Sequence, residues 1–519
     1  MLVKVFASAT QGVDARTIDV EVNSGGEVQA GKLGYFLVGL PDNAVKEGYM
    51  RIEAAAKNIG LRLPRIKMTV NLAPADIRKE GAAYDLPIAI GMLAASGYVR
   101  TEILDRYIIL GELSLDGTLR PVKGALPIAI QARKEGFKGF ILPAENAREA
   151  AIVNDLEVYA ASDLRQVVDF FNGQGELKKV EVDTREEFFI NQSNYTIDFS
   201  DVKGQDNIKR ALEIAAAGGH NVILIGPPGA GKTMLAKRLP TILPQLSLKE
   251  ALETTKIHSV AGTLPRDASL ITQRPFRSPH HTISDVALVG GGSNPRPGEI
   301  SLAHNGVLFL DELPEFKREV LEVMRQPMEE RMVTISRARQ TIDYPASLML
   351  VASMNPCPCG YYNHPEKECV CAPGVVKKYL NKISGPLLDR IDLHVEVTPV
   401  SYDKLADYEP VAEKSGDIRL RVEAARRIQE GRFDTQRNIY CNAQMPGNMV
   451  REVCKLSTAG VTLLKTAMNK LQLSARAYDR ILKVSRTIAD LENSPEIKIE
   501  HLAEAIHFRS LDKEAWAPA

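Results

Sequence analysis

The stretch Val222-Ile-Leu-Ile-Gly-Pro-Pro-Gly-Ala-Gly-Lys-Thr233 places an apolar run directly before a glycine-rich loop that ends in lysine and threonine. The apolar run predicts a buried strand, and Met234 to Leu239 predicts a helix after the loop. Such a loop wraps phosphates with backbone N–H groups, while the lysine reaches the β- and γ-phosphates and the threonine hydroxyl binds Mg²⁺. A chance glycine-rich turn is the alternative, and the order of strand, loop and helix argues against it. The predicted ATP-binding residues are Gly226, Pro227, Pro228, Gly229, Ala230, Gly231, Lys232 and Thr233.

A second apolar run, Val307-Leu-Phe-Leu, ends in the two carboxylates Asp311 and Glu312. Downstream of a phosphate-binding loop, this pattern predicts that Asp311 holds Mg²⁺ together with Thr233. Glu312 is then expected to orient and deprotonate the attacking water, because phosphoryl transfer depends mainly on positioning and charge stabilisation. A strand that ends in solvated acids is the alternative. The presence of Glu312 favours hydrolysis over a nucleotide-controlled switch.

The 519 residues predict about three domains, since a domain averages roughly 150 residues. The first, residues 1–172, mixes short strands with apolar-faced helices, and a polar, charged stretch at 173–194 is the expected linker. Residues 195–400 alternate helices with short apolar strands, which is typical of a doubly wound parallel sheet. Residues 401–519 show only helical periodicity and are expected to form a helical lid. The predicted fold class is α/β.

The composition narrows the class of protein but does not identify a binding partner. The formal net charge is zero, so nucleic-acid binding would have to come from local basic elements. Six cysteines in a long chain that lacks a secretion signal favour reduced thiols or a metal site over disulfides. Without a signal peptide or an apolar run of membrane-spanning length, we expect a cytoplasmic protein with no membrane partner.

Three further segments are specific enough to indicate a family: Arg274-Pro-Phe-Arg-Ser-Pro-His-His281, Pro295-Arg-Pro-Gly-Glu-Ile-Ser-Leu-Ala-His304 and Asp311-Glu-Leu-Pro-Glu-Phe316. With these motifs the chain resembles, from end to end, the magnesium-chelatase-like AAA+ ATPases of the YifB/ComM type. The resemblance implies a ring, usually a homohexamer, with each ATP site shared between neighbouring subunits. It also implies a DNA helicase or translocase, acting on single-stranded or branched DNA during recombination of incoming DNA.

The same resemblance assigns roles to three more residues. Asn355 matches sensor 1, which places the lytic water or senses the γ-phosphate. Arg390, in Pro386-Leu-Leu-Asp-Arg-Ile-Asp392, matches the arginine finger that is donated to a neighbouring subunit. Arg476 matches sensor 2, and Arg480, one helical turn later, is the competing candidate. For each arginine, a surface salt bridge is the alternative.

The N-terminal segments Val38-Gly-Leu-Pro-Asp-Asn-Ala-Val-Lys-Glu47 and Lys79-Glu-Gly-Ala-Ala-Tyr-Asp-Leu-Pro-Ile88 look like the subunit-ChlI domain. That domain is similar in fold to the Lon protease domain, which is a ribosomal S5 domain 2-like α/β fold. Lon-type proteolysis needs a serine nucleophile and a lysine. Ala83 stands at the nucleophile position and Leu126 near the lysine position, so proteolysis is disfavoured.

Four of the cysteines form two C-x-C pairs, Cys357 with Cys359 and Cys369 with Cys371. Four thiolates on a short loop can satisfy tetrahedral zinc, although C-x-C is less diagnostic than C-x₂-C. The two alternatives are a structural zinc site, in which His364 could replace one thiolate, and four free thiols. Cys441 and Cys454 lack such pairing and are expected to be buried, unreactive thiols.

The segment Val333-Thr-Ile-Ser-Arg-Ala-Arg-Gln-Thr-Ile-Asp-Tyr344 predicts a hairpin with Arg337 and Arg339 at its tip. It resembles the pre-sensor hairpin of the family, which within a ring could contact DNA phosphates without reading sequence. A solvated hairpin tip is the alternative. Arg274 and Arg277 are further candidates for DNA contact or for contact with a neighbouring subunit.

The leading hypothesis is therefore an ATP-hydrolysing DNA motor. A chelatase-type ATPase that remodels a protein partner is the runner-up, and a nucleotide-binding scaffold without turnover is a third class, against which Glu312 and Arg390 argue. DNA-stimulated ATP turnover separates the first from the other two.

Overall fold

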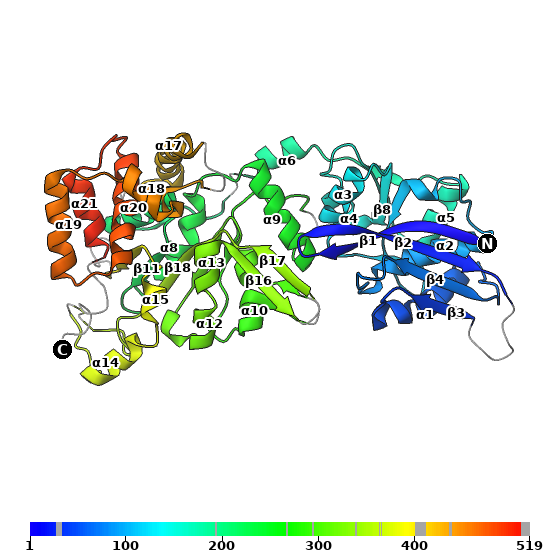
Figure 1. The fold of residues 1–519 in the computed structure, drawn as a ribbon, viewed down its shortest axis with the longest axis horizontal. Helices are drawn as coiled ribbons and strands as arrows, with labels where there is room; N and C mark the ends of the chain where they lie inside the picture. Colours follow the sequence, from blue (N-terminus) through cyan, green and yellow to red (C-terminus); the bar gives the residue numbers. More distant parts are fainter. Residues whose placement is uncertain are drawn as a thin grey trace. The chain divides into compact units, whose positions relative to one another are not determined.

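The computed structural model describes residues 1–26, 34–192, 195–265, 268–292, 295–337, 340–362, 364, 366–399, 412–434 and 439–509. The chain divides into two compact units (Figure 1). The first comprises Met1–Asn191, Leu248–Thr272 and Pro295–Pro297, and the second comprises Gln192–Ser247, Gln273–Asn294 and Gly298–Ala519.

The first unit is built on a mixed eight-stranded sheet of order β10-β9-β8-β5-β1-β2-β4-β3. The neighbours β1/β2, β2/β4 and β9/β10 are antiparallel, and the remaining neighbours are parallel. Alternate residues of β2, such as Ile18, Val20 and Val22, are buried, as expected for a sheet with one face on the core. The strands are β1 (Leu2–Gln11), β2 (Asp14–Ser24), β3 (Tyr35–Val38), β4 (Met68–Ala73), β5 (Tyr107–Ile109), β8 (Gly139–Pro143), β9 (Glu157–Ala161) and β10 (Lys178–Val180), with a separate hairpin of β6 (Glu112–Leu113) and β7 (Leu119–Arg120).

Helices pack against this sheet, and one of them, α2, is buried along its whole length. A helix that is apolar on all sides belongs inside a core. The helices of this unit are α1 (Asn43–Asn58), η1 (Ala82–Tyr84), α2 (Asp85–Ala95), η2 (Leu104–Arg106), α3 (Ala125–Lys134), α4 (Ala144–Ala150), α5 (Leu164–Asn172), α6 (Thr184–Asn191) and α9 (Leu248–Ala261).

The second unit contains a five-stranded sheet of order β12-β15-β18-β11-β19, in which every pair of neighbours is parallel. Every residue of β11, β15 and β18 is buried, which explains why these strands are continuous apolar runs. The carboxyl ends of the strands therefore share one edge. The strands are β11 (Val222–Ile225), β12 (Phe276–Arg277), β15 (Val307–Leu310), β18 (Met349–Met354) and β19 (Leu393–Glu396).

The predicted hairpin before β18 is present as the antiparallel pair β16 (Met332–Arg337) and β17 (Gln340–Pro345) (Figure 1). The short elements β13 (Gly290–Gly291) and β14 (Arg296–Pro297) lie in the insertion before β15. Helices before and between the strands are η3 (Phe199–Asp201), α7 (Asp206–Gly218), α8 (Lys232–Arg238), η4 (Leu239–Thr241), α10 (Asp285–Val289), α11 (Glu299–Leu302), η5 (Leu313–Glu315), α12 (Arg318–Glu322), α13 (Arg325–Glu330), α14 (Pro373–Leu380) and α15 (Gly385–Leu388).

After β19, the described residues form helices without a further strand. They gather at one side of the second unit, at the orange and red end of the chain (Figure 1). Ala477, Ile481, Val484 and Ile488 of α20 are buried, as the helical periodicity predicts. These helices are α17 (Ser415–Phe433), η6 (Asn442–Gln444), α18 (Gly447–Val453), α19 (Thr458–Lys470), α20 (Ala475–Leu491) and α21 (Ile499–His507).

The structure confirms a mixed α/β fold with a parallel sheet, but its two compact units divide the chain differently from the three expected domains. The second unit holds most of the expected 195–400 core together with the expected 401–519 lid. The segment 173–194, expected to be a linker, carries β10, which pairs with β9, and α6. The segment 248–272, expected to belong to the 195–400 core, groups with the first unit. There the backbone of Ser259 on α9 accepts a hydrogen bond from Gly124, and Lys256 lies 2.6 Å from Asp14. Long-range packing of this kind leaves no mark in local composition.

None of the helices in the described ranges combines the length and hydropathy that a bilayer-spanning segment needs.

Candidate nucleotide site

The loop between β11 and α8 adopts a conformation that depends on its glycines. Gly226 lies so close to β19 that a Cβ atom would sit 2.1 Å from the Val397 carbonyl oxygen. Gly231 has a φ of +86°, a left-handed conformation that side-chain-bearing residues rarely adopt. The glycine pattern of the sequence therefore corresponds to steric requirements of the loop.

Lys232, the first residue of α8, lies across this loop. Its ammonium group donates to the carbonyl oxygens of Gly226 at 2.7 Å and Pro227 at 2.9 Å, and to Asn355 Oδ1 at 3.1 Å. Burial lowers the pKa of Lys232, and the nearby Asp311 and Glu312 partly oppose that effect. The ammonium charge is thus held beside the carboxylates at the mouth of the loop.

Asp311 and Thr233 meet at the same edge of the sheet, because β11 and β15 are both parallel to β18, which lies between them. Thr233 Oγ1 donates to Asp311 Oδ2 at 2.8 Å. Ser353, the fifth residue of β18, donates to the other carboxylate oxygen, Oδ1. A hydroxyl and a carboxylate are hard oxygen ligands, so this donor set fits Mg²⁺.

Glu312 follows Asp311 with a φ of +55°, an unusual value for a non-glycine residue. This conformation turns its side chain away from the core, and 57% of the side chain is exposed. Its Oε2 atom lies 3.4 Å from Nδ1 of His281, whose ring lies 4.1 Å from that of His280. Glu312 therefore presents an exposed carboxylate directly after Asp311.

Asn355 directly follows β18 and brings its amide to Lys232. Tyr379 of α14 approaches the same residue. Burial raises the pKa of Tyr379, with a further contribution from Glu315, while a hydrogen bond from the backbone of Asn355 works in the opposite direction. The structure thus brings together five of the predicted site residues: Lys232, Thr233, Asp311, Glu312 and Asn355.

The three arginines are placed differently from one another. Arg390 has a side chain that is 6% exposed and pairs with Glu329 at 2.5 Å. Arg480 pairs with the buried Asp392 at 2.8 Å. Arg476 is 59% exposed, and its closest carboxylate is Asp389 at 3.9 Å. Of the two candidates for sensor 2, Arg476 therefore has the side chain that is available to a nucleotide, whereas Arg480 has a structural partner.

The side chains of two candidate DNA-contacting residues form hydrogen bonds within the chain. Arg274 donates to the backbone oxygens of Pro244, Asn305 and Gln245 at 2.6, 2.7 and 3.3 Å. Arg277 forms a two-pronged pair with Glu299 at 2.6 and 2.7 Å. These bonds occupy donors that a phosphate would need. Arg337 ends β16 and is exposed, whereas Arg339 lies outside the described residues.

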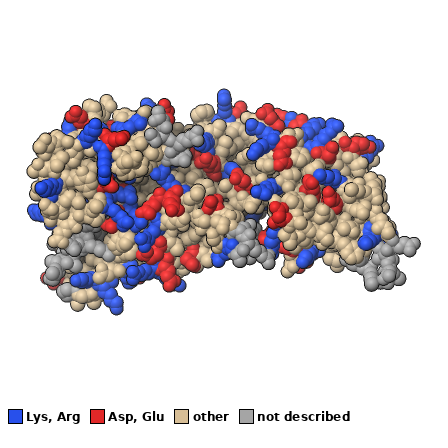
Figure 2. Space-filling model, in the orientation of Figure 1, with Lys and Arg blue, Asp and Glu red and all other residues tan. Residues whose placement is uncertain are grey.

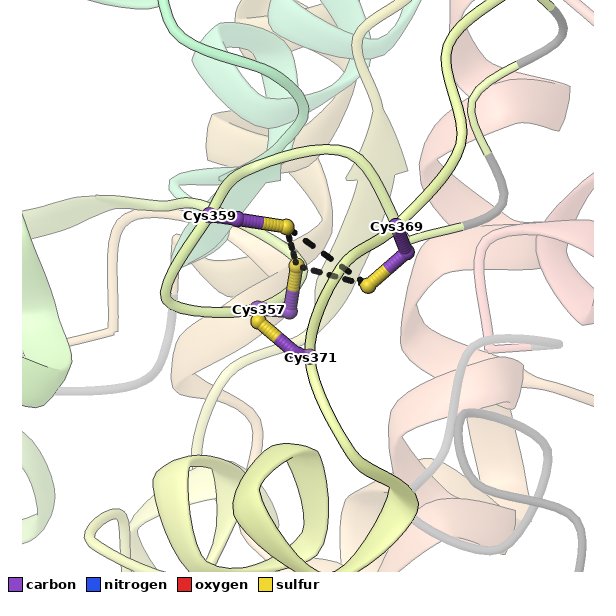
Figure 3. Close-up of side chains that lie close together, drawn as sticks. All are labelled: Cys357, Cys359, Cys369 and Cys371. Carbon is purple, nitrogen blue, oxygen red and sulfur yellow. Dashed lines mark hydrogen bonds between the residues drawn. The ribbon is translucent and has the colours of Figure 1, made fainter.

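The four paired cysteines converge, and their side chains point toward a common centre (Figure 3). All four sulfur atoms lie within 4.8 Å of one another, and the shortest separations are 3.3, 3.5 and 3.6 Å. His364 is not part of this group. Its Nδ1 atom instead accepts hydrogen bonds from the backbone of Glu366 and Lys367, both at 3.1 Å. Cys441 and Cys454 are buried elsewhere, as predicted, and burial raises the pKa of Cys454 to about 12.

Sequence reasoning missed two residues of the site. Ser353 is the single hydroxyl in the apolar strand Met349–Met354, and this was a usable signal. His281 lies in a motif that was noted, but its distance from Glu312 follows only from the path of the insertion before β15. No spacing rule could have provided it.

Comparison with known proteins identifies the family. Models described as "Magnesium chelatase, subunit ChlI", "Subunit ChlI of Mg-chelatase" and "Magnesium chelatase, subunit ChlI C-terminal" match residues 198–405, 20–146 and 412–509. The chain is 44% identical over 507 residues to competence protein ComM of Haemophilus influenzae, covering 98% of this chain and 97% of that protein.

It is also 44% identical over 509 residues to the uncharacterized protein YifB of Escherichia coli, again covering 98% and 97%. A shorter match of 150 residues, 29% identical, relates 27% of this chain to 26% of Lon protease 2 of Bacillus subtilis. Proteins of the AAA+ class use ATP with Mg²⁺, hydrolyse it and commonly form oligomers. This chain belongs to the magnesium-chelatase-like AAA+ ATPases of the ComM/YifB type.

Proposed function

We propose that this chain is the subunit of a ring-forming, ATP-driven DNA helicase or translocase that acts on single-stranded or branched DNA during recombination. The observation that carries the proposal is the convergence of Lys232, Thr233, Asp311, Glu312 and Asn355 at one edge of a parallel sheet. The resemblance to a competence protein along almost the whole chain supports DNA as the partner. In this proposal the protein acts in the cytoplasm, where incoming DNA recombines.

Each residue of the site has a proposed task. Lys232 exchanges its contacts with Gly226 and Pro227 for the β- and γ-phosphates of ATP. Thr233 and Asp311 would hold Mg²⁺, which supplies positive charge to the phosphates when it is bound. Glu312 accepts the proton of the attacking water, with His281 near enough to restrain its carboxylate. Asn355, fixed at the end of β18, orients that water or the γ-phosphate.

The remaining roles require a second subunit. Arg390 is proposed as the arginine finger and Arg476 as sensor 2, and both would complete a site shared in a hexamer. The exposed side chain of Arg476 suits such a role directly. Arg390 would first have to leave Glu329.

The proposed DNA contact is the tip of the β16–β17 hairpin. Arg337 is exposed at the end of β16, and the other proposed contact, Arg339, lies outside the described residues. Basic and acidic side chains are interspersed over the face of the molecule in Figure 2, in keeping with a net charge of zero. A local basic element is therefore the expected form of a contact that reads no base sequence.

The test is steady-state ATP turnover of the purified protein with and without single-stranded and forked DNA. We expect DNA to stimulate ATP turnover. Glu312→Gln should abolish turnover both with and without DNA. Arg337→Ala should reduce the stimulation by DNA while sparing basal turnover. Arg451→Ala, which removes an exposed arginine from α18, is the matched control and should behave like the wild type.

Other outcomes would favour the alternatives. Turnover that requires Glu312 but ignores DNA would contradict the helicase proposal and favour a chelatase-type motor that remodels a protein partner, in line with the matched family descriptions. ATP-dependent peptide cleavage would instead favour the Lon-like alternative. We disfavour that alternative because Ala83, in η1, stands at the position expected for the reactive serine, and the buried Leu126 of α3 stands near the position expected for the lysine.

We also propose that Cys357, Cys359, Cys369 and Cys371 bind one zinc ion. With Zn–S bonds of about 2.3 Å, the sulfur atoms of a tetrahedral site lie roughly 3.8 Å apart. The sulfur separations here, with three at 3.3 to 3.6 Å and all within 4.8 Å, need only small adjustments. Elemental analysis of the purified chain tests this, with one zinc per subunit expected.

A further inference from the structure

The four-cysteine loop begins and ends next to parts of the nucleotide site. Asn355 is separated from Cys357 by one residue, and Cys371 is separated by one residue from α14, which begins at Pro373. The loop therefore joins the residue that contacts Lys232 to the helix that carries Tyr379. A ligand that gathers the cysteines fixes the distance between these two ends.

The middle of the loop rests on the phosphate-binding loop itself. A Cβ atom added to Gly360 would lie 2.5 Å from Cδ and 3.2 Å from Cγ of Pro228. The backbone of Gly360 is thus packed directly on the proline ring, with no room for a side chain. A hydrogen bond of 3.0 Å from Gly360 N to the carbonyl oxygen of Cys357 ties this contact to the first cysteine.

The loop is also held on the side of α14. Cys357 is fully buried, and Tyr379 of α14 is nearly so. The hydrogen bond between Tyr379 and the backbone of Asn355 joins α14 to the end of β18. The loop is thus connected to Pro228 on one side and to Asn355 and Tyr379 on the other.

The described part of the loop is held by short-range contacts, among them the hydrogen bonds that His364 Nδ1 accepts from the backbone of Glu366 and Lys367 and the edge-to-face contact of the Tyr361 and His364 rings. Its described residues include no helix or strand between β18 and α14. Ordering the backbone of a loop costs conformational entropy, and metal binding offsets such a cost in small metal sites. Without the metal, four thiols held within 4.8 Å of one another have only weak mutual hydrogen bonds.

We infer that zinc in the four-cysteine loop clamps Gly360 onto Pro228, so that the bound metal sets the affinity of the phosphate-binding loop for nucleotide. The inference rests on the proposed nucleotide and zinc sites and adds a regulatory role to the metal. Loss of the metal releases Gly360 and lets the loop at Pro228 sample other conformations. The apparent dissociation constant for nucleotide then rises in inverse proportion to the fraction of molecules that remain in the competent conformation.

The experiment measures nucleotide affinity directly, by fluorescence titration of the full-length protein with a labelled ATP analogue in excess Mg²⁺. Zinc is removed with a thiol-reactive mercurial followed by dithiothreitol, which spares Mg²⁺, and metal content is measured on the same samples. We expect the dissociation constant to rise about tenfold or more in the zinc-free protein and to recover when zinc is restored. Circular dichroism should show that the fold persists.

Two variants separate the clamp from general damage. Gly360→Ala keeps all four cysteines, so zinc should stay bound while nucleotide affinity falls, because the added methyl group collides with Pro228 and the φ of +84° at this position disfavours a side chain. Cys371→Ser should lose zinc and affinity together. Cys441→Ser, the same substitution at a buried cysteine outside the cluster, should change neither.

A protein that contains no zinc would overturn the inference, and so would zinc removal and Gly360→Ala that both leave nucleotide affinity unchanged. If Cys371→Ser does not fold, the Gly360→Ala result decides. A chain that hydrolyses ATP equally well with and without zinc would refute the clamp but leave the proposed motor intact. Zinc-dependent nucleotide binding without any ATP turnover would support the clamp and contradict the proposed motor.

Discussion

The guanidinium group of Arg390 forms an ion pair with Glu329, with 2.5 Å between Nη2 and Oε1, although 52% of the Glu329 side chain is exposed. Nη1 donates to the carbonyl oxygen of Pro386 at 2.6 Å. Two of the three guanidinium nitrogens are therefore occupied within the subunit. An arginine that stabilises phosphate charge in a neighbouring site must exchange these partners, and the exposed carboxylate is the one that water can most readily replace.

We predict that Arg390→Ala lowers kcat for ATP by about a thousandfold, the typical contribution of an arginine finger. Binding of ATP within one subunit should change little, because none of the bonds of Lys232 involves Arg390. Turnover measured against protein concentration, together with nucleotide titration, checks both expectations.

The ion pair itself is tested by Glu329→Gln, which keeps the shape of the side chain and removes its charge. We expect basal turnover to stay equal to that of the wild type or to rise, because Arg390 leaves a neutral partner more easily. If Glu329→Gln lost activity as completely as Arg390→Ala, the pair would be part of the active arrangement, and the finger assignment would be wrong.

Substitutions at Lys232 and at Glu312 should separate ATP binding from ATP hydrolysis. Lys232→Ala removes the ammonium that lies over the loop and should abolish measurable ATP binding, and turnover with it. Glu312→Gln keeps the hydrogen-bonding shape but cannot accept a proton, so ATP should bind normally while kcat falls about a hundredfold or more. Equilibrium binding and single-turnover hydrolysis measure the two effects. Equal losses of affinity in both variants would contradict the proposed division of roles.

The sequence predicts those parts of the site in which an apolar strand is followed directly by a site residue. Each apolar run that leads into a predicted site segment, at Gly226, Asp311 and Asn355, becomes a strand of the parallel sheet, and parallel strands end at the same edge. Convergence of these segments follows from the rule that βαβ connections keep strands parallel. Hence the fold class and the gathering of these segments could both be inferred before the structure.

What could not be predicted depends on contacts between distant segments. Arg274 and Arg277 lie in a basic, family-specific motif, yet backbone oxygens and Glu299 occupy their guanidinium groups. The grouping of α9 with the first unit likewise depends on packing against residues more than a hundred positions away. A charged residue in a sequence does not reveal whether its partner belongs to the same chain.

The two candidates for sensor 2 differ in burial and in their partners. Arg480 pairs with Asp392, whose own pKa would be raised by burial but is held well below its usual range by Arg480 and His220. Removing one partner of a buried pair costs about 3 to 5 kcal/mol. We therefore predict that Arg480→Ala lowers the melting temperature sharply, whereas Arg476→Ala leaves it unchanged and reduces kcat. Thermal unfolding and ATPase assays of both variants check this, and the opposite pattern would transfer the sensor role to Arg480.

Lys483 of α20 gives a prediction about pH. Burial, reinforced by Arg480, lowers the pKa of this lysine from 10.5 to about 8, although its ammonium donates to the carbonyl oxygen of Ala443 at 3.0 Å. The unfolded chain therefore binds a proton more tightly than the folded chain, so stability rises as pH increases from about 8 to 10.5. Below that window the buried charge costs roughly 3 kcal/mol.

Lys483→Met keeps the length of the side chain and removes the titrating group. The variant should be more stable than the wild type at pH 7, and its advantage should disappear between pH 8 and 10.5. Melting temperatures of the two proteins across that range measure the difference, and parallel pH profiles would show that Lys483 keeps an ordinary pKa.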